Sequence, residues 1–310
     1  MSDIKTLPRK TSIKRGRKMK YLVLTEDDKN LMLYLHDFIY LDMDFIVKYI
    51  FDRYKTKQSA STRLLRLEDA GYLKKFRAQT PDSPEGYSAN VYTLTSTGVA
   101  VVEELQGYVR WKVRWTRNLP MWYMHSLQLA RAVISYERQA PNFNLEVKDF
   151  VHETRAYHQF TEHKEDVIRP DGFIVIGPKN SDENFGIFLE MERTVSKKHV
   201  LQSKIEQYTN FQEHSKAKEK YQYDKGLAAF VSNWFVMFIA ENEAKMRRTL
   251  RLLGMIKPRE GESPSDLRPD VHIPVLLANL EDIKENAFGE IYRHINEEDY
   301  KTKRSLLNYM

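Results

Sequence analysis

Three short amphipathic segments, closely spaced and followed by a strand hairpin, constrain the first third of this 310-residue chain. The first starts at Thr25 with an acidic first turn, as at a helix N-terminus, and carries apolar residues to position 38. A second covers 42–51, and a third starts near Ser59 and ends at Gly71, where glycine accommodates a left-handed cap. Three short helices with tight connections predict a helix-turn-helix arrangement.

Two strand-like segments, 72–77 and 90–95, follow the third helix. Prolines and a glycine in the loop 80–86 between them exclude both helix and strand. The sequence of 58–73, with its Gly-Tyr-Leu step into the first strand, resembles the recognition helix of winged-helix proteins. The resemblance covers about residues 20–106 and implies that the hairpin is a wing.

The polar face of the third helix is expected to enter the major groove of double-stranded DNA, because short polar side chains and arginines hydrogen-bond base edges and phosphates. This face consists of Lys57, Gln58, Ser59, Ser61, Thr62, Arg63 and Arg66. On the first wing strand, Lys74, Lys75 and Arg77 are expected to contact the DNA backbone. A winged helix that contacts proteins, with these charges merely solvated, is the alternative.

Positive charge is concentrated in the first part of the chain. Residues 1–125 carry 22 Lys and Arg against 14 Asp and Glu, whereas the remaining residues carry 27 against 29. Eight of the basic side chains lie within 1–20, a run that cannot fold alone but can neutralise DNA phosphates. We predict a flexible basic arm that binds DNA; a solvated tail without a partner is the alternative.

The remaining chain predicts an α/β core in the order helix, three strands, helix, strand, helix, strand. Before it, residues 108–117 interleave tryptophans with arginines, which can stack on bases, although rings packed into an interdomain seam are the favoured interpretation. The predicted class is therefore a two-domain α+β or α/β protein. Its segments are an arm at 1–20, a winged-helix domain at 21–107, a linker at 108–123, a nuclease-like α/β domain at 124–280 and a helical tail at 281–310.

Composition excludes several other classes. The absence of cysteine excludes thiolate metal sites and cysteine nucleophiles, and suits a reducing compartment. The N-terminus lacks the apolar core of a secretory signal, and the longest apolar run, 234–240, is too short to span a bilayer. We expect a cytoplasmic protein with no membrane partner.

Three carboxylates are expected at the ends of two neighbouring strands. Asp171 opens the strand 171–176, and Glu190 and Glu192 share one face of the strand 186–192, because side chains alternate along a strand. Carboxylates this close repel each other and are hard to bury without a compensating cation. Since oxygen ligands suit a hard cation, we predict a Mg²⁺ or Mn²⁺ site at Asp171, Glu190 and Glu192.

Pro170-Asp171 followed by Glu190-x-Glu192, in this order of helices and strands, resembles the PD-(D/E)XK nuclease superfamily. The resemblance implies that Asp171 and Glu190 hold the metal. Glu192 stands where that superfamily usually has a lysine that helps to activate water, which weakens the catalytic assignment. Lys204 and Tyr208, one turn apart on the predicted helix 196–214, resemble a downstream element of some members and are candidates for a displaced basic group.

The winged helix and these motifs together resemble the replication-relaxation family of plasmids and mobile elements, over roughly residues 20–240. The resemblance implies a DNA-binding protein that acts in replication, relaxation or mobilisation, with replication or conjugation proteins as partners. One hypothesis is a Mg²⁺-dependent endonuclease or nickase; its catalytic residues would be Asp171, Glu190, Glu192, Lys204 and Tyr208. The rival is a non-enzymatic replication initiator or transcriptional regulator whose nuclease-like domain only binds DNA or proteins. A tyrosine-nucleophile relaxase lacks the support of a His-x-His motif.

Overall fold

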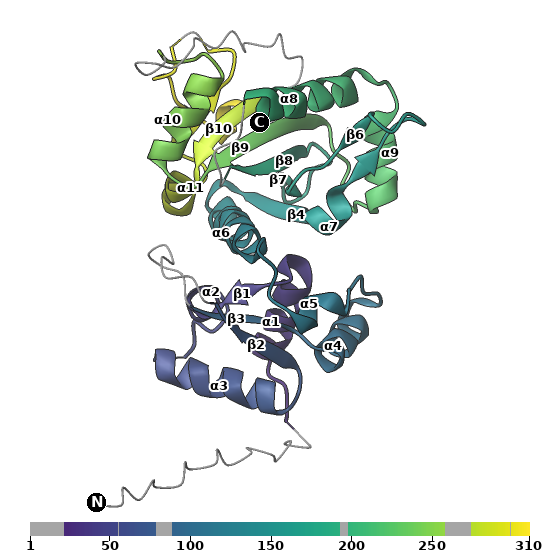
Figure 1. Ribbon diagram of the computed structural model, residues 1–310, viewed down its shortest axis with the longest axis vertical. Coiled ribbons are helices and arrows are strands. Elements are labelled where there is room, and N and C mark those ends of the chain that lie inside the picture. Colours follow the sequence, from purple (N-terminus) through teal and green to yellow (C-terminus); the bar gives the residue numbers. More distant parts are fainter. Residues whose placement is uncertain (1–21, 55, 79–88, 193–197, 258–273, 298) are drawn as a thin grey trace, which may run out of the picture.

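A computed structural model describes residues 22–54, 56–78, 89–192, 198–257, 274–297 and 299–310. The described chain is a mixed α+β protein with two units (Figure 1). The N-terminal unit, residues 22–106, holds short helices and a small sheet. The sheet unit, residues 123–310, is built on a seven-stranded mixed sheet. The expected basic arm at 1–20 and the loop 80–86 lie outside the described residues.

Three helices open the N-terminal unit, as the sequence predicts. They are α1 (Glu26–Phe38), α2 (Met43–Tyr49) and α3 (Lys57–Asp69). The predicted N-cap of α1 is confirmed, because the Thr25 hydroxyl accepts a hydrogen bond from the Asp28 backbone and the Asp28 carboxylate accepts one from the Thr25 backbone. The cap of α3 is Thr56, so this helix begins two residues before the predicted start. Gly71 follows it with a φ of 84°, the left-handed conformation expected there.

A three-stranded antiparallel sheet completes the N-terminal unit. Its strands are β1 (Leu41–Asp42), β2 (Leu73–Arg77) and β3 (Asn90–Leu94), in the order β1-β3-β2. Strands β2 and β3 form the predicted hairpin. The sequence prediction omits β1, which has only two residues, and the helix α4 (Ser96–Gln106), which packs on α1.

The tryptophan-rich segment after α4 packs between the two units. It contains the short helix α5 (Arg114–Arg117). Trp115 is buried with Tyr40, Tyr123 and Leu127 in a small apolar cluster, and the Tyr40 hydroxyl donates to the Trp115 carbonyl at 2.9 Å. These aromatic rings are therefore part of the seam between the units.

The large sheet has the strand order β12-β11-β10-β9-β8-β7-β4. Its strands are β4 (Leu145–His152), β7 (Gly172–Pro178), β8 (Phe185–Glu192), β9 (Asn233–Ala240), β10 (Val275–Asn279), β11 (Glu290–His294) and β12 (Arg304–Ser305). The central strands β8, β9 and β10 run parallel, and the flanking pairs are antiparallel. Beside the sheet lies the small hairpin of β5 (His158–Gln159) and β6 (Val167–Ile168).

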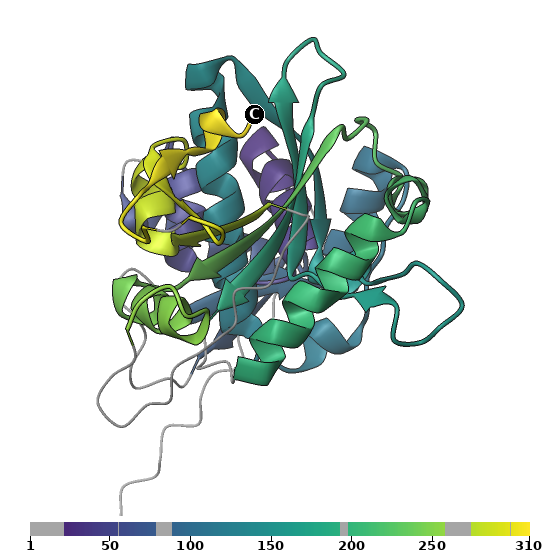
Figure 2. The same ribbon diagram turned by 90° about the horizontal axis from the view of Figure 1, so that it is seen from above.

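Helices cover both faces of this sheet (Figure 2). One face carries α8 (Lys198–Glu213), α9 (Ala217–Lys225) and α10 (Glu243–Leu252), and the other carries α6 (Tyr123–Gln139) and α11 (Leu280–Asn286). Side chains of β8 alternate between the two faces as predicted. Ile187 and Leu189 join the core under α6, while Phe188 packs with Tyr208 and Phe211 of α8.

Helix α6 joins the two units into one core. On the side of α6 that faces the N-terminal unit, one terminal nitrogen of the Arg131 guanidinium donates to both oxygens of the buried Asp42 carboxylate, at 2.8 and 3.0 Å. Near it, the ring of Phe38 in α1 lies 4.9 Å from that of Phe150 in β4. The buried apolar residues of α1, α2, α3 and α6 and of one sheet face form one continuous cluster.

The C-terminal segment corrects the sequence prediction. We expected the α/β domain to end at 280 and a helical tail to follow at 281–310, but α11 ends at Asn286, and β11 and β12 extend the sheet beyond β10. The five residues of β11 are mostly polar, so they lack the apolar alternation that reveals a strand. No helix among the described residues is long and apolar enough to cross a membrane.

Candidate functional site

Asp171 is fixed at the start of β7 by the backbone of the neighbouring strand. The register pairs Gly172 with Leu189, which places Asp171 opposite Glu190 on β8. The Asp171 backbone N–H donates to the Leu189 carbonyl at 3.0 Å, and the Asp171 carboxylate accepts from the Met191 N–H at 2.7 Å. The predicted proximity of these two acidic positions follows from this pairing. We call the end of the sheet that carries Asp171, Glu190 and Glu192 the acidic edge.

Glu190 and Glu192 point toward α8, as their spacing predicts, and are only 1% and 6% exposed. The Lys204 ammonium donates to Glu190 at 2.7 Å and to Glu192 at 3.3 Å. The Tyr208 hydroxyl donates to the other oxygen of Glu190 at 2.5 Å. The structure therefore brings together the strand carboxylates and both helix residues singled out from the sequence.

The charges of this group are strongly coupled. Burial and, to a smaller extent, the Asp171 charge raise the pKa of Glu190 to about 7, although Lys204 and Tyr208 oppose the shift. Burial by itself would lower the pKa of Lys204, but Glu190, Asp171 and Glu192 together hold it above its usual value. Lys204 is thus held as a cation at the acidic edge, and Glu190 keeps its proton to a higher pH than an exposed glutamate does.

A second set of groups surrounds the other side of Asp171. His125, Glu153 and Asp171 each offer a ligand atom, and these atoms lie within 4.8 Å of one another. The Nε2 atom of His125 is 3.0 Å from the Asp171 carboxylate. All three side chains are half-buried, and this spacing and donor set are compatible with a metal ion.

This arrangement corrects the predicted metal set. We expected Asp171, Glu190 and Glu192 to share one cation, but Lys204 lies between the two glutamates and already compensates their charge. Among the described residues, the three-residue group with metal-ligand spacing is the one with His125 and Glu153. Of the predicted ligands, only Asp171 belongs to it.

Neither Glu153 nor His125 was among the metal ligands predicted from the sequence. Glu153 begins the short helix α7 (Glu153–Ala156) directly after β4. It reaches Asp171 because β4 pairs with β7, with His152 opposite Gly172. No local sequence pattern reveals this pairing. His125 lies in the first turn of α6, where its position ahead of an amphipathic helix was the available signal.

A cavity opens beside Asp171. It has a volume of about 490 Å³ and is lined by Glu153, Thr154, Tyr157, Arg169, Pro170 and Asp171. The guanidinium of Arg169 lies over the ring of Tyr157, 5.4 Å from its centroid. A ligand in this cavity would therefore meet both carboxylates and a cation.

Most residues predicted to contact DNA lie on the exposed side of α3 and β2. The exposed ones are Lys57, Gln58, Ser59, Thr62, Arg66, Lys74 and Arg77, while Ser61 and Lys75 are half-buried. Lys57 pairs with Asp44, and Lys75 with Glu68 at 3.4 Å. These placements leave a polar, net basic surface on α3 and the first hairpin strand.

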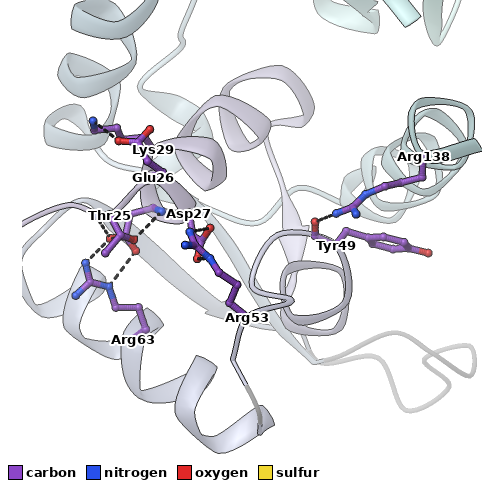
Figure 3. Close-up of polar contacts among 9 residues, drawn as sticks. Thr25, Glu26, Asp27, Lys29, Tyr49, Arg53, Arg63 and Arg138 are labelled. Atoms are coloured by element: carbon purple, nitrogen blue, oxygen red, sulfur yellow. Dashed lines mark hydrogen bonds and ion pairs between the residues drawn. The ribbon is translucent and has the colours of Figure 1, made fainter. Parts of the chain in front are cut away.

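Arg63 is the exception, and its predicted place on the exposed face is wrong. Figure 3 shows its side chain directed at the first turn of α1. There it forms an ion pair with the fully buried carboxylate of Asp28 and donates to the Val23 carbonyl at 2.9 Å. Arg63 is one turn from both Ala60 and Leu67, which are buried, so its position on the helix borders the core.

Comparison with known proteins gives one family. The replication-relaxation family matches residues 34–225, more than half of the chain. No curated protein matches the sequence. Among solved structures, restriction endonuclease FokI aligns with 84% of this chain and 42% of its own at 9% identity and a TM-score of 0.29; its DNA-bound form aligns with 83% and 43%, at 9% identity and a TM-score of 0.23. This chain thus spans less than half of those chains, and a TM-score below 0.5 does not establish a shared fold. The match over residues 34–225 shows that the chain belongs to the replication-relaxation family.

Proposed function

We propose that this protein binds the DNA of a plasmid or mobile element through a winged helix, and that its acidic edge hydrolyses a phosphodiester bond with the help of a divalent cation. Membership of the replication-relaxation family supports a role in replication or relaxation. The observation that carries the enzymatic part is the convergence, at Asp171, of a group with metal-ligand spacing and a buried lysine–carboxylate cluster.

The N-terminal unit supports the DNA-binding part. Three helices followed by a strand hairpin are the elements of a winged helix, with α3 as the recognition helix and the hairpin as the wing. The exposed side of α3 offers Arg66 and short polar side chains, which can hydrogen-bond base edges. Lys74 and Arg77 on β2 would contact phosphates and so set the register on the duplex.

At the acidic edge, Asp171, Glu153 and His125 would hold the cation. A bound divalent ion would polarise a phosphate and lower the pKa of a water molecule. One imidazole and two carboxylates suit Mn²⁺ at least as well as Mg²⁺, whose preferred ligands are all oxygens.

Lys204 would replace the lysine that PD-(D/E)XK nucleases usually carry at the position of Glu192. Its ammonium group reaches the carboxylates of β8 from helix α8, within 2.7 Å of Glu190. In that place it supplies positive charge beside a phosphate that gains negative charge in the transition state. Glu190 and Tyr208 hold the ammonium group and each other in position through two hydrogen bonds.

The test is nicking of supercoiled plasmid by the full chain with Mn²⁺ or Mg²⁺. Asp171→Ala should abolish nicking, and Lys204→Met should reduce it by about a hundredfold or more, the typical effect of losing a positioned electrostatic group. Lys198→Met, at the exposed start of the same helix, is the matched control and should nick normally. Mn²⁺ should also raise the melting temperature of the wild type but not of Asp171→Ala, because a ligand of the folded state stabilises it.

A wild-type protein that binds DNA but nicks with neither metal would exclude the enzymatic proposal. The second candidate, a replication initiator or transcriptional regulator without catalysis, would then be preferred. The ion pairs of Lys204 with both glutamates favour that candidate, because they compensate the carboxylates without a metal.

A further inference from the structure

A second cavity adjoins the one beside Asp171. It has a volume of about 340 Å³ and shares Thr154 and Tyr157 with its neighbour. Its other walls come from the segment between the two units and from α7. We call it the aromatic cleft; its main lining residues are Arg110, Trp111, Lys112, Trp115, Arg155 and Tyr157.

The aromatic cleft is basic. Three of its lining residues are cationic, and no Asp or Glu lines it among the residues that the structure describes. Two further cations, which do not line the cleft, contact Tyr157. Arg169 lies over its ring, and the Lys225 ammonium donates to its carbonyl at 2.6 Å. Such a concentration of positive charge attracts a polyanion.

Ring faces lie among these charges. Trp111 and Trp115 contact each other edge to face, with centroids 5.0 Å apart, and the Lys112 ammonium lies 5.8 Å from the centre of the Trp115 ring. Trp115 is buried and Trp111 is half-buried, whereas Tyr157 is 45% exposed, so Tyr157 is the ring of this cleft that is open to a base. Rings interleaved with cations are the combination that binds single-stranded nucleic acids, because bases stack on the rings while the cations follow the phosphates.

We propose that the aromatic cleft binds an unpaired nucleotide of single-stranded DNA, so that the adjoining phosphate faces the cavity beside Asp171. A base within a duplex is stacked and paired, and cannot enter such a cleft. That the bound strand is also the substrate rests on the proposed function, whereas the binding of single-stranded DNA to the cleft does not. The preferred DNA would thus be a nicked, melted or single-stranded segment next to a duplex held by the N-terminal unit.

The test is binding of fluorescently labelled oligothymidylate, about 15 nucleotides long, to the full chain without divalent metal. Tyr157→Ala should weaken binding about tenfold, which corresponds to about 1.4 kcal/mol. Lys112→Gln should weaken it a few-fold and flatten its salt dependence, because one phosphate contact is lost. Affinity for a duplex of the same length should stay within about twofold, since the cleft does not hold paired bases.

Two matched controls come from the opposite end of the sheet. Phe230 precedes β9 and is 62% exposed, and Lys179 follows β7 and is also exposed. Phe230→Ala and Lys179→Gln should bind oligothymidylate like the wild type. Unchanged binding by Tyr157→Ala, or equal losses for single-stranded and duplex DNA, would overturn the proposal. Tighter binding of an oligouridylate of the same length would overturn the assignment to DNA.

Omitting the metal separates this proposal from the proposed function. If the wild type does not nick plasmid but Tyr157→Ala binds oligothymidylate more weakly than the wild type, catalysis is refuted and binding in the aromatic cleft is supported. A wild type that nicks normally, with oligothymidylate binding unchanged in Tyr157→Ala, would support catalysis and refute the cleft.

Discussion

Buried carboxylates have different partners in the two units of this protein. In the N-terminal unit, Asp28 pairs with Arg63, and Asp42 pairs with Arg131. At the acidic edge, Glu190 pairs with Lys204 and Asp171 lies against His125. Asp28 completes the capping box of α1 and Asp42 is the N-cap of α2, so the carboxylate of each also accepts from a backbone N–H group.

The choice of partner separates structural charge from reactive charge. A guanidinium does not release its proton and can hold both oxygens of a carboxylate at once, which fixes the geometry of the pair. Lysine and histidine form fewer directional bonds, and their protonation responds to burial and neighbouring charge. We therefore expect the arginine pairs to serve stability and the acidic edge to serve chemistry.

The largest expected effect comes from Arg131→Met, which would leave Asp42 buried and uncompensated. Breaking a buried ion pair from one side costs about 3 to 5 kcal/mol of unfolding free energy, measurable by urea denaturation. The control is Arg53→Met, because Arg53 is mostly exposed and solvent screens its ion pair with Asp27, so its loss should change the free energy of unfolding little. A loss for Arg131→Met as small as for this control would contradict a structural role of the arginine pairs.

The next effect separates two arginines of α3. Arg63→Ala should cost about 2 to 3 kcal/mol of unfolding free energy, because the Asp28 carboxylate would stay buried without its ion-pair partner. Arg66→Ala should leave stability nearly unchanged and lower duplex DNA affinity by about 1 to 3 kcal/mol. Both can be followed by urea denaturation and gel-shift titration of the same proteins. If Arg63→Ala lost DNA affinity but no stability, the original assignment of Arg63 to the DNA face would be restored.

The smallest effect is a pH dependence that belongs to the sheet unit. Burial, together with Lys225, lowers the pKa of His158 to about 4, although Asp224 opposes the shift. The unfolded chain takes up this proton near pH 6.5 and the folded chain does not, so stability is full above that pH and falls as the pH drops toward 4. Between pH 7.5 and pH 5 the loss should be roughly 1 to 2 kcal/mol.

His158→Phe should reduce that loss, because the phenyl ring fills the contacts with Phe211 and Tyr221 and does not titrate. Melting temperatures of variant and wild type at the two pH values measure the difference. An equal drop in both proteins would assign the acid sensitivity to other groups, including those of the N-terminal unit.

Features set by local spacing could be predicted from the sequence. The cap at Thr25 depends on the next three residues, and the shared face of Glu190 and Glu192 depends on alternation along one strand. Lys204 and Tyr208 lie one turn apart on one helix, so a single orientation of α8 brings both to the strand.

Features set by tertiary pairing could not be predicted. Glu153 meets Asp171 only because β4 and β7 adopt one particular register. Lys204 lies between the two glutamates because α8 packs across that face of the sheet with Lys204 opposite the end of β8. Strand β11 escaped prediction for a similar reason: its place depends on pairing with β10 and not on its own composition.

The continuous core around α6 has a geometric consequence for DNA handling. Because α1, α6 and the sheet share buried side chains, the recognition surface and the acidic edge cannot swing relative to each other as beads on a tether would. The distance between the two surfaces is therefore fixed. On the proposed function, any bond that the protein breaks should lie at a constant number of base pairs from the sequence bound by α3. Inserting base pairs between the two points should therefore change which bond is broken and leave the bound sequence the same.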